Sequence, residues 1–247
     1  KPRYRKTTNP KSHLGETTFL LLFESTPRYK QYLKYSLRTS VFGMKMVSSE
    51  ESKDQRRGIA GLVLIVKMVG AASQSVETLE ELDRIAKLIV LHTRSVGVSM
   101  SPGSIPATGK PTFEIDEELI GLGMGIHGEP GVSEIPMKTA DELTPQMLDL
   151  IFEDFENDED IEHLKEGDEI LLFVNSLGAT TMMECLICLR KAKEYLNERG
   201  IRVYDTIVGP LVTCQEMSGI SFSITKLNDE LKGYWDLPCE SVCYTKL

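Results

Sequence analysis

One histidine in a glycine-rich turn is the residue of this sequence best placed to do chemistry. His127 follows Gly125 by two positions and directly precedes Gly128, within the segment GIHGEPG. Because glycine has no side chain, the backbone can approach a ligand closely and leave the imidazole edge open. Neutral imidazole attacks carbonyl carbons when a partner fixes its tautomer, and Glu129 is near enough in sequence to be that partner or to bind a substrate hydroxyl. From these residues alone, a purely structural histidine remains the alternative.

The remaining histidines and the cysteines predict no second reactive site. His13 and His163 lie in a terminus and in an acidic stretch, and His92 lies on a predicted helix. Cys185 and Cys188 have the spacing of a metal-binding pair, but they fall inside an apolar helical pattern that favours buried core thiols. Five cysteines, an odd number, fit a reducing cytoplasm better than a disulfide framework. We therefore expect a cytoplasmic protein with no metal site.

Composition and charge argue against several classes of function. The 247 residues carry a formal net charge of −9, which opposes contact with phosphate backbones, so we expect no direct nucleic-acid binding. No phosphate loop is present and residues 121–125 (GLGMG) do not match a dinucleotide fingerprint, so we expect no nucleotide cofactor. No apolar run approaches the roughly 20 residues of a membrane-spanning helix. The sequence has neither a start methionine nor a signal-peptide pattern, which predicts a soluble chain that is incomplete at its front.

Apolar runs that alternate with amphipathic patterns predict an α/β fold. The segment 101–111 holds three prolines and two glycines, so we place a domain junction there and expect two domains, residues 1–104 and 105–247. The acidic stretch 153–162 is interpreted as solvated surface. Strands are expected over residues 17–23, 41–47, 119–126, 169–174, 201–208 and 221–227, and helices over 29–38, 58–72, 76–92, 142–155 and 181–199.

Several short motifs follow one another in order over most of the chain. They are RRGIAG (56–61) with the apolar helix after it, GKPTF (109–113), GMGIHGEPG (123–131), NSLGAT (175–180), MSG (217–219), KLNDEL (226–231) and WDLP (235–238). In this order they resemble the substrate-binding K subunit of dihydroxyacetone kinases. The resemblance implies two α/β domains with mixed sheets flanked by helices, and a homodimer.

The resemblance also implies a ligand and a mode of binding. The family's histidine that matches His127 forms a hemiaminal with the ketone carbon of dihydroxyacetone, and Gly125, Gly128 and Glu129 are expected to line the same site. Nucleotide binds to a separate helical L subunit in this family, which agrees with the lack of a phosphate loop here.

The sequence departs from the family's kinases at two places. The kinases carry a glycine-rich, histidine-containing loop near their start, which we do not find. They also carry a Lys-Asn-Tyr-Thr-Gly-Asp segment after an apolar strand, whose Asp is the base for the attacking hydroxyl. Aligned without gaps, Phe23 takes the Lys position and Arg28 takes the Asp position. An arginine cannot act as a general base at physiological pH.

Two functions therefore stay open. The first is a non-catalytic coactivator that binds dihydroxyacetone and docks on a TetR-like transcription regulator of the kinase operon. The second is a working K subunit that passes its bound substrate to a nucleotide-loaded L subunit. The departure at Phe23 and Arg28 favours the first.

Overall fold

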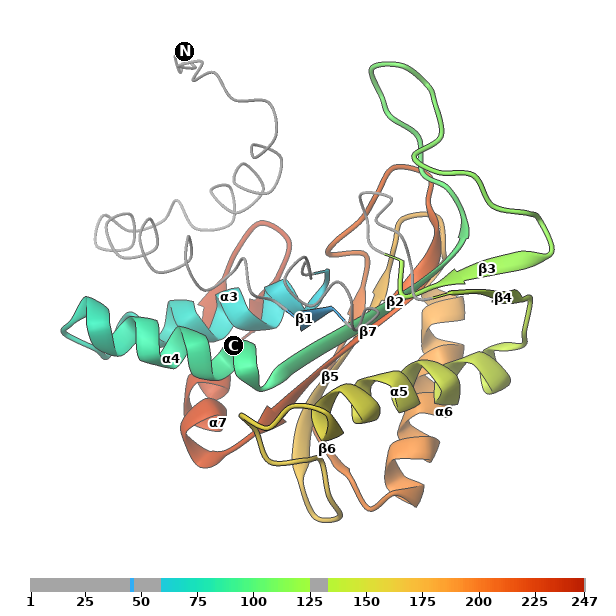
Figure 1. Cartoon of the computed structure of the whole chain (residues 1–247). Coiled ribbons are helices and arrows are strands. Elements are labelled where there is room, and N and C mark those ends of the chain that lie inside the picture. Colours follow the sequence, from blue (N-terminus) through green and yellow to red (C-terminus); the bar gives the residue numbers. More distant parts are fainter. Residues whose placement is uncertain (1–44, 47–58, 125–132, 247) are drawn as a thin grey trace, which may run out of the picture.

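A mixed β-sheet lies between two layers of helices in the computed structural model, which describes residues 45–46, 59–124 and 133–246 (Figure 1). Within these residues the sheet has seven strands in the order β4-β3-β2-β7-β5-β6, and β1 pairs with β2. The pairs β1–β2 and β5–β6 are parallel, and the others are antiparallel. The strands are β1 (Lys45–Met46), β2 (Thr93–Ser101), β3 (Leu119–Leu122), β4 (Ser133–Pro136), β5 (Glu169–Ser176), β6 (Arg202–Gly209) and β7 (Ser218–Leu227).

Helices cover both faces of this sheet. One face carries α3 (Gly61–Ala72), α4 (Leu79–Leu91) and α7 (Asp229–Asp236), and the other carries α5 (Ala140–Glu156) and α6 (Met182–Glu198). After α7, β8 (Cys239–Glu240) and β9 (Thr245–Lys246) form a small hairpin. The α/β architecture with a mixed sheet and flanking helices is confirmed. In the part of the chain that the structure describes, no helix is long and apolar enough to cross a membrane.

Local sequence signals explain where the two longest helices begin and end. Both α5 and α6 start at a capping box, in which a threonine (Thr139 or Thr181) and a glutamate three residues later satisfy each other's backbone N–H groups. Gly200, just past α6, has a φ of +70°, a conformation that glycine adopts without steric cost. These ends match the predicted helices 142–155 and 181–199 to within a few residues.

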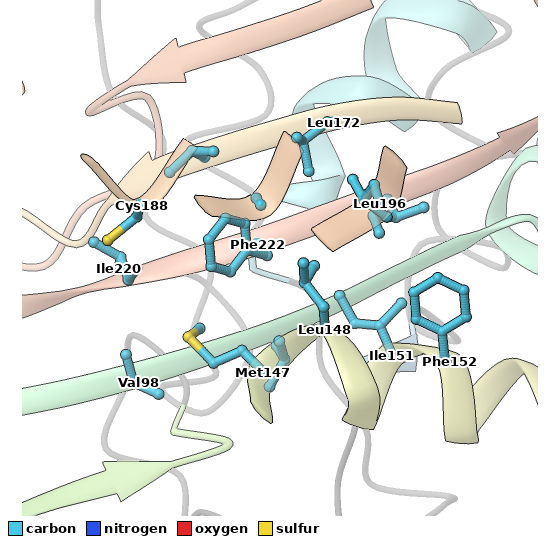
Figure 2. Packing of buried hydrophobic residues seen from close by; sticks show 14 of the residues in the cluster. Val98, Met147, Leu148, Ile151, Phe152, Leu172, Cys188, Leu196, Ile220 and Phe222 are labelled. Atoms are coloured by element: carbon cyan, nitrogen blue, oxygen red, sulfur yellow. The ribbon is translucent and has the colours of Figure 1, made fainter. Parts of the chain in front are cut away.

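The two faces of the sheet differ in the size of their side chains. Large apolar residues of β5 and β7, among them Leu172, Ile220 and Phe222, pack against Leu148 and Leu196 of α5 and α6 (Figure 2). On the α3 face, β2 and β7 instead present serine and threonine. The Ser95 and Ser223 hydroxyls lie 2.7 Å apart, as a buried pair. The face covered by α5 and α6 therefore buries most of the apolar side chains of β2 and β7. The face covered by α3 has smaller side chains, which allow the helix to approach the sheet more closely.

Gly61 shows how close that approach is. A Cβ at this position would lie 2.5 Å from the Ser95 hydroxyl, so α3 rests directly on the small residues of the sheet. The predicted helix 58–72 is confirmed as α3, and Gly61 allows it to pack closely on the sheet.

Several predicted elements are confirmed and several were missed. The strands predicted at 169–174, 201–208 and 221–227 are β5, β6 and β7, and the helix predicted at 76–92 is α4. The predictions at 17–23 and 29–38 lie outside the described residues, as does 41–47 except for β1. The strands β2 and β4 and the helix α7 were not predicted. Because β2 precedes residue 104 and pairs with β7 beyond it, one sheet draws strands from both sides of the expected domain boundary, whose position stays a prediction.

The acidic stretch at 153–162 is not simply solvated surface, and that interpretation was wrong in part. Asp154 is 8% exposed, and its carboxylate lies 2.6 Å from the guanidinium of Arg94, which is fully buried. Asp158 is also paired with Arg94. The Arg94 guanidinium further stacks over the ring of Phe155, 4.7 Å from its centroid. Part of the acidic run therefore neutralises a buried cation at the start of β2.

We predict that this buried group of charges contributes strongly to stability. Replacing Arg94 with alanine leaves Asp154 without its cation in a buried place, which should lower the free energy of unfolding by about 3–5 kcal/mol in urea titration. The control is Arg84→Ala, because Arg84 forms exposed ion pairs with Glu81 and Glu230 and should contribute little. Equal effects of the two substitutions would contradict the assignment.

His92 makes stability depend on pH. Its Nδ1 lies 3.0 Å from the carbonyl oxygen of Lys226, so the neutral ring donates there, and burial lowers the His92 pKa below its ordinary 6.5. A group whose folded pKa is lowered contributes stability that is present above the unfolded pKa and is lost as pH falls through the folded value. The free energy of unfolding of the wild type should therefore fall relative to His92→Gln between about pH 7.5 and about pH 5. A difference independent of pH would refute this.

Candidate functional site

The predicted ligand residues lie in the connection between β3 and β4. His127, Gly125, Gly128 and Glu129 fall outside the described residues, so their roles stay predictions. The structure does fix both ends of this connection, because Leu122 of β3 pairs with Ser133 of β4. We call residues 123–132 the β3–β4 loop. It leaves and re-enters the sheet at neighbouring positions.

The first residues of the β3–β4 loop are held against β2. The Gly123 N–H donates a 2.7 Å hydrogen bond to the carbonyl oxygen of Gly97, and Gly123 has a φ of +76°. This left-handed turn carries the chain from β3 onto the α3 face of the sheet. There the Met124 carbonyl lies so close to Gly97 that a Cβ on Gly97 would be 2.5 Å from its oxygen, and 3.4 Å from the Ile59 side chain near the start of α3.

The part of the sheet below this point is made of small residues. The register places Gly97 of β2, Ser221 of β7, Asn175 of β5 and Gly209 of β6 in one row across the sheet. The next row toward the carboxyl ends of β2 and β5 consists of Gly121, Ser99 and Gly219. We call these two rows the small-residue strip. It carries no charged side chain, and its polar groups are buried and bonded within the protein: the Ser99 hydroxyl donates to the Ser101 carbonyl, and Asn175 donates to the Ser221 hydroxyl.

Asn175 joins the small-residue strip to the loop that follows β6. Its side-chain oxygen accepts hydrogen bonds from the backbone N–H groups of Leu211 (3.1 Å) and Val212 (2.9 Å). Its amide nitrogen donates to the Val212 carbonyl at 2.8 Å and to the Ser221 hydroxyl at 3.3 Å. Asn175 is fully buried, and this one side chain fixes a loop more than 30 residues away in sequence by three hydrogen bonds, with a fourth to β7.

The turn after Asn175 is equally constrained. The Ser176 hydroxyl donates to the Thr180 carbonyl at 2.7 Å and accepts from the Gly178 N–H at 3.1 Å. Gly178 has a φ of +145°, and a Cβ there would collide with the carbonyl of Cys214. The NSLGAT motif singled out in the sequence is therefore a rigid turn at the carboxyl end of β5, where ligands of open α/β sheets are commonly found.

The cysteine pair of α6 takes no part in such a site. Cys185 and Cys188 are buried in the core between α6 and the sheet, as predicted. Burial raises the pKa of the Cys185 thiol to about 11, so it stays protonated at neutral pH. Among residues 59–124 and 133–246, no group of three or more His, Cys, Asp or Glu side chains is arranged to hold a metal ion.

Asn175 provides a test of how this edge of the sheet is built. Asn175→Ala removes the side-chain acceptor of the Val212 N–H and one of the two acceptors of the Leu211 N–H. This should cost about 1–3 kcal/mol in the free energy of unfolding and speed hydrogen exchange at Leu211 and Val212. Ser221→Ala is the control, because it removes only the longer bond and should cost less than about 1 kcal/mol. Unchanged exchange at Leu211 and Val212 in Asn175→Ala would contradict the proposed role.

Comparison with known proteins places this geometry in a family. The Dak1 domain matches residues 44–243. The chain is 33% identical over 195 residues to the dihydroxyacetone-binding subunit DhaK of PTS-dependent dihydroxyacetone kinase 2 from Listeria innocua. That alignment covers 79% of this chain and 57% of the subunit, so the chain spans little more than half the length of this relative.

Two solved structures have a similar fold. The dihydroxyacetone kinase operon co-activator Dha-DhaQ superposes with a TM-score of 0.70 at 23% identity, over 87% of this chain and 67% of that one. The dihydroxyacetone kinase of C. freundii superposes with a TM-score of 0.61 at 25% identity, over 74% of this chain and 32% of that one. Taken with the family match over residues 44–243, these likenesses show that the chain belongs to the Dak1 domain family.

Proposed function

We propose that this protein captures dihydroxyacetone, or a closely related short ketose, as a covalent hemiaminal on His127, and that it reports the ligand to a TetR-like transcription regulator. The observation that carries the proposal is the segment GIHGEPG at 125–131, in a chain of the Dak1 family that is 33% identical to a dihydroxyacetone-binding subunit.

The chemistry needs only the histidine and the ketone. The unprotonated ring nitrogen of His127 donates its electron pair to the ketone carbon, and a C–N bond forms while the carbonyl π bond breaks. The carbonyl oxygen takes up a proton, and the other ring nitrogen releases one. The adduct is therefore the sum of the two reactants, with no loss of water and no oxidant or cofactor.

A covalent bond suits so small a ligand. Dihydroxyacetone has about six non-hydrogen atoms, and non-covalent binding gives at most about −1.5 kcal/mol for each of them. A reversible bond to carbon adds affinity and also selects ketones over polyols that lack a carbonyl.

The segment after the first predicted strand favours sensing over catalysis. Phe23 and Arg28 occupy the positions at which the family's kinases have their Lys and Asp. Arginine keeps its proton at any physiological pH, so it cannot accept one from the ligand hydroxyl during phosphoryl transfer. Covalent capture on His127 needs neither of these groups. Both positions lie outside the described residues, so this argument rests on sequence.

A second function is supported by the relatives. The L. innocua protein is a subunit of a kinase, and the structurally similar C. freundii protein is a kinase. In this alternative the chain hands its bound ketose to a nucleotide-loaded L subunit. A homodimer is expected in either case, carried over from the family resemblance.

The covalent adduct is directly measurable. With dihydroxyacetone labelled with ¹³C at the ketone carbon, the protein should convert the carbonyl signal to that of a tetrahedral carbon. Intact mass under native conditions should rise by the full mass of the ketone. His127→Ala should abolish both changes, whereas His163→Ala, which alters an exposed histidine, should abolish neither. An adduct that persists in His127→Ala would refute the assignment.

The choice between sensing and catalysis needs a separate assay. The purified protein, mixed with an ATP-loaded L subunit and dihydroxyacetone, should give no dihydroxyacetone phosphate, because no base is present at position 28. A relative with the intact Lys and Asp, combined with the same L subunit, is the positive control. Turnover by this protein would replace the sensing role with the kinase role and leave the adduct proposal standing.

A further inference from the structure

We propose that Gly97, in the middle of β2, is a positioning residue for His127: its missing side chain is the space that lets the β3–β4 loop start on the surface of the sheet. This inference rests on the proposed function, because it assigns Gly97 a role in ligand capture. Gly97 itself touches no ligand in this proposal.

The first step is that glycine is needed at position 97 for space and not for backbone conformation. Gly97 lies inside a regular strand, paired with Ser221 of β7, and its φ is outside the left-handed range that favours glycine. Any residue could adopt this backbone. Glycine in the interior of a strand costs roughly 0.5–1 kcal/mol relative to alanine. Since the strand geometry does not require glycine at position 97, we look for the reason in the atoms that pack over it.

The second step is what lies over Gly97. A Cβ at this position would lie 2.5 Å from the Met124 carbonyl oxygen, closer than real Cβ contacts come. The neighbour is backbone, which cannot rotate away as the end of a side chain can. The Gly97 carbonyl also accepts the 2.7 Å hydrogen bond from the Gly123 N–H. One residue of β2 therefore holds the start of the loop by a hydrogen bond and makes room for it.

The third step concerns which segment moves, β2 or the start of the β3–β4 loop, when a methyl group is added at position 97. β2 is bound along its length to β7, with partners from Thr93 to Ser101, and lies in the interior of the sheet. Met124 has no such neighbours in a ladder. A methyl group at position 97 will therefore displace Met124 rather than β2, and His127 lies only three residues further along the chain.

Gly121 offers a matched control on the neighbouring strand. A Cβ there would lie 2.6 Å from Met124 as well, but from Cγ of its flexible side chain. The side chain can rotate while the backbone stays in place. Gly97→Ala and Gly121→Ala thus add the same methyl group beside the same residue, and only the first presses on the course of the loop.

The closing experiment uses the whole protein and its histidine NMR signals. The chain has four histidines, and the spectrum of His127→Ala identifies the signal of His127. In ligand-free protein, Gly97→Ala should shift the His127 signal and leave those of His92 and His163 in place, whereas Gly121→Ala should shift none of the three. With ¹³C-labelled dihydroxyacetone, adduct formation should be roughly tenfold to a hundredfold slower in Gly97→Ala than in Gly121→Ala, since small misplacements of reacting atoms cost about that much.

Each outcome decides one of the two proposals. An unmoved His127 signal with unchanged adduct formation in Gly97→Ala would overturn the role of Gly97 and leave the covalent function intact. Loss of all folded signals in Gly97→Ala would also overturn it, because the effect would then be global. If the wild type forms no adduct, the proposed function fails, while the shift of the His127 signal in ligand-free protein still reports whether Gly97 sets the position of the histidine.

Discussion

Close approach of backbone to backbone on the α3 face of the sheet is the constraint on which the rest of this structure depends. On this face, from β3 across to β6, the two rows near the carboxyl ends of β2 and β5 hold glycine, serine or asparagine. This absence of bulk lets α3 rest on Ser95 and lets Met124 lie over Gly97. Larger side chains would lift both segments off the sheet. Because these small side chains include serine and asparagine, the same positions carry hydrogen-bonding groups and not apolar ones.

On the opposite face of the sheet, β2 and β7 carry large apolar side chains in place of the serine and glycine of the α3 face. Phe222, Ile220 and Leu172 bury their side chains against α5 and α6, and this supplies apolar contact that serines and glycines cannot (Figure 2). Arg94 adds a different kind of constraint at the far end of β2, because its burial obliges Asp154 and Asp158 to fold back onto the sheet. The α3 face has an apolar core of its own, in which Leu171 and Phe173 of β5 pack with residues of α3, α4 and α7.

The sequence was a good guide wherever large apolar residues or helix ends carried the signal. Residues 169–174 (EILLFV) predicted β5, and Thr181 with Gly200 marked the ends of α6. The same reasoning missed β2 because its apolar alternation is short, limited to Val96, Val98 and Met100. The other face of the strand holds small polar residues and glycine, and a buried arginine lies near its start. Its strand character comes from pairing with β7, which is distant in sequence.

The candidate site was predictable in part, for the same reason. Motif order pointed to His127, and to residues 175–180, without showing what Asn175 binds, since its partners Leu211 and Val212 come from a separate loop. The importance of Gly97 was invisible as well, because a glycine in a strand can be understood only from the atom that lies over it. His127, Gly125, Gly128 and Glu129 stay predictions.

The pairing of Leu122 with Ser133 has a consequence for how the β3–β4 loop can vary. The sheet brings the two ends of residues 123–132 together during folding, so the entropy of loop closure is lost when the sheet forms, before any ligand binds. Lengthening such a loop is inexpensive, since each doubling adds only about 0.6 kcal/mol to the closure term. Insertions between these ends would therefore add little to the loop-closure entropy that the fold must overcome. The length of this loop can thus change while the pairing of β3 with β4, and the sheet around it, stays the same.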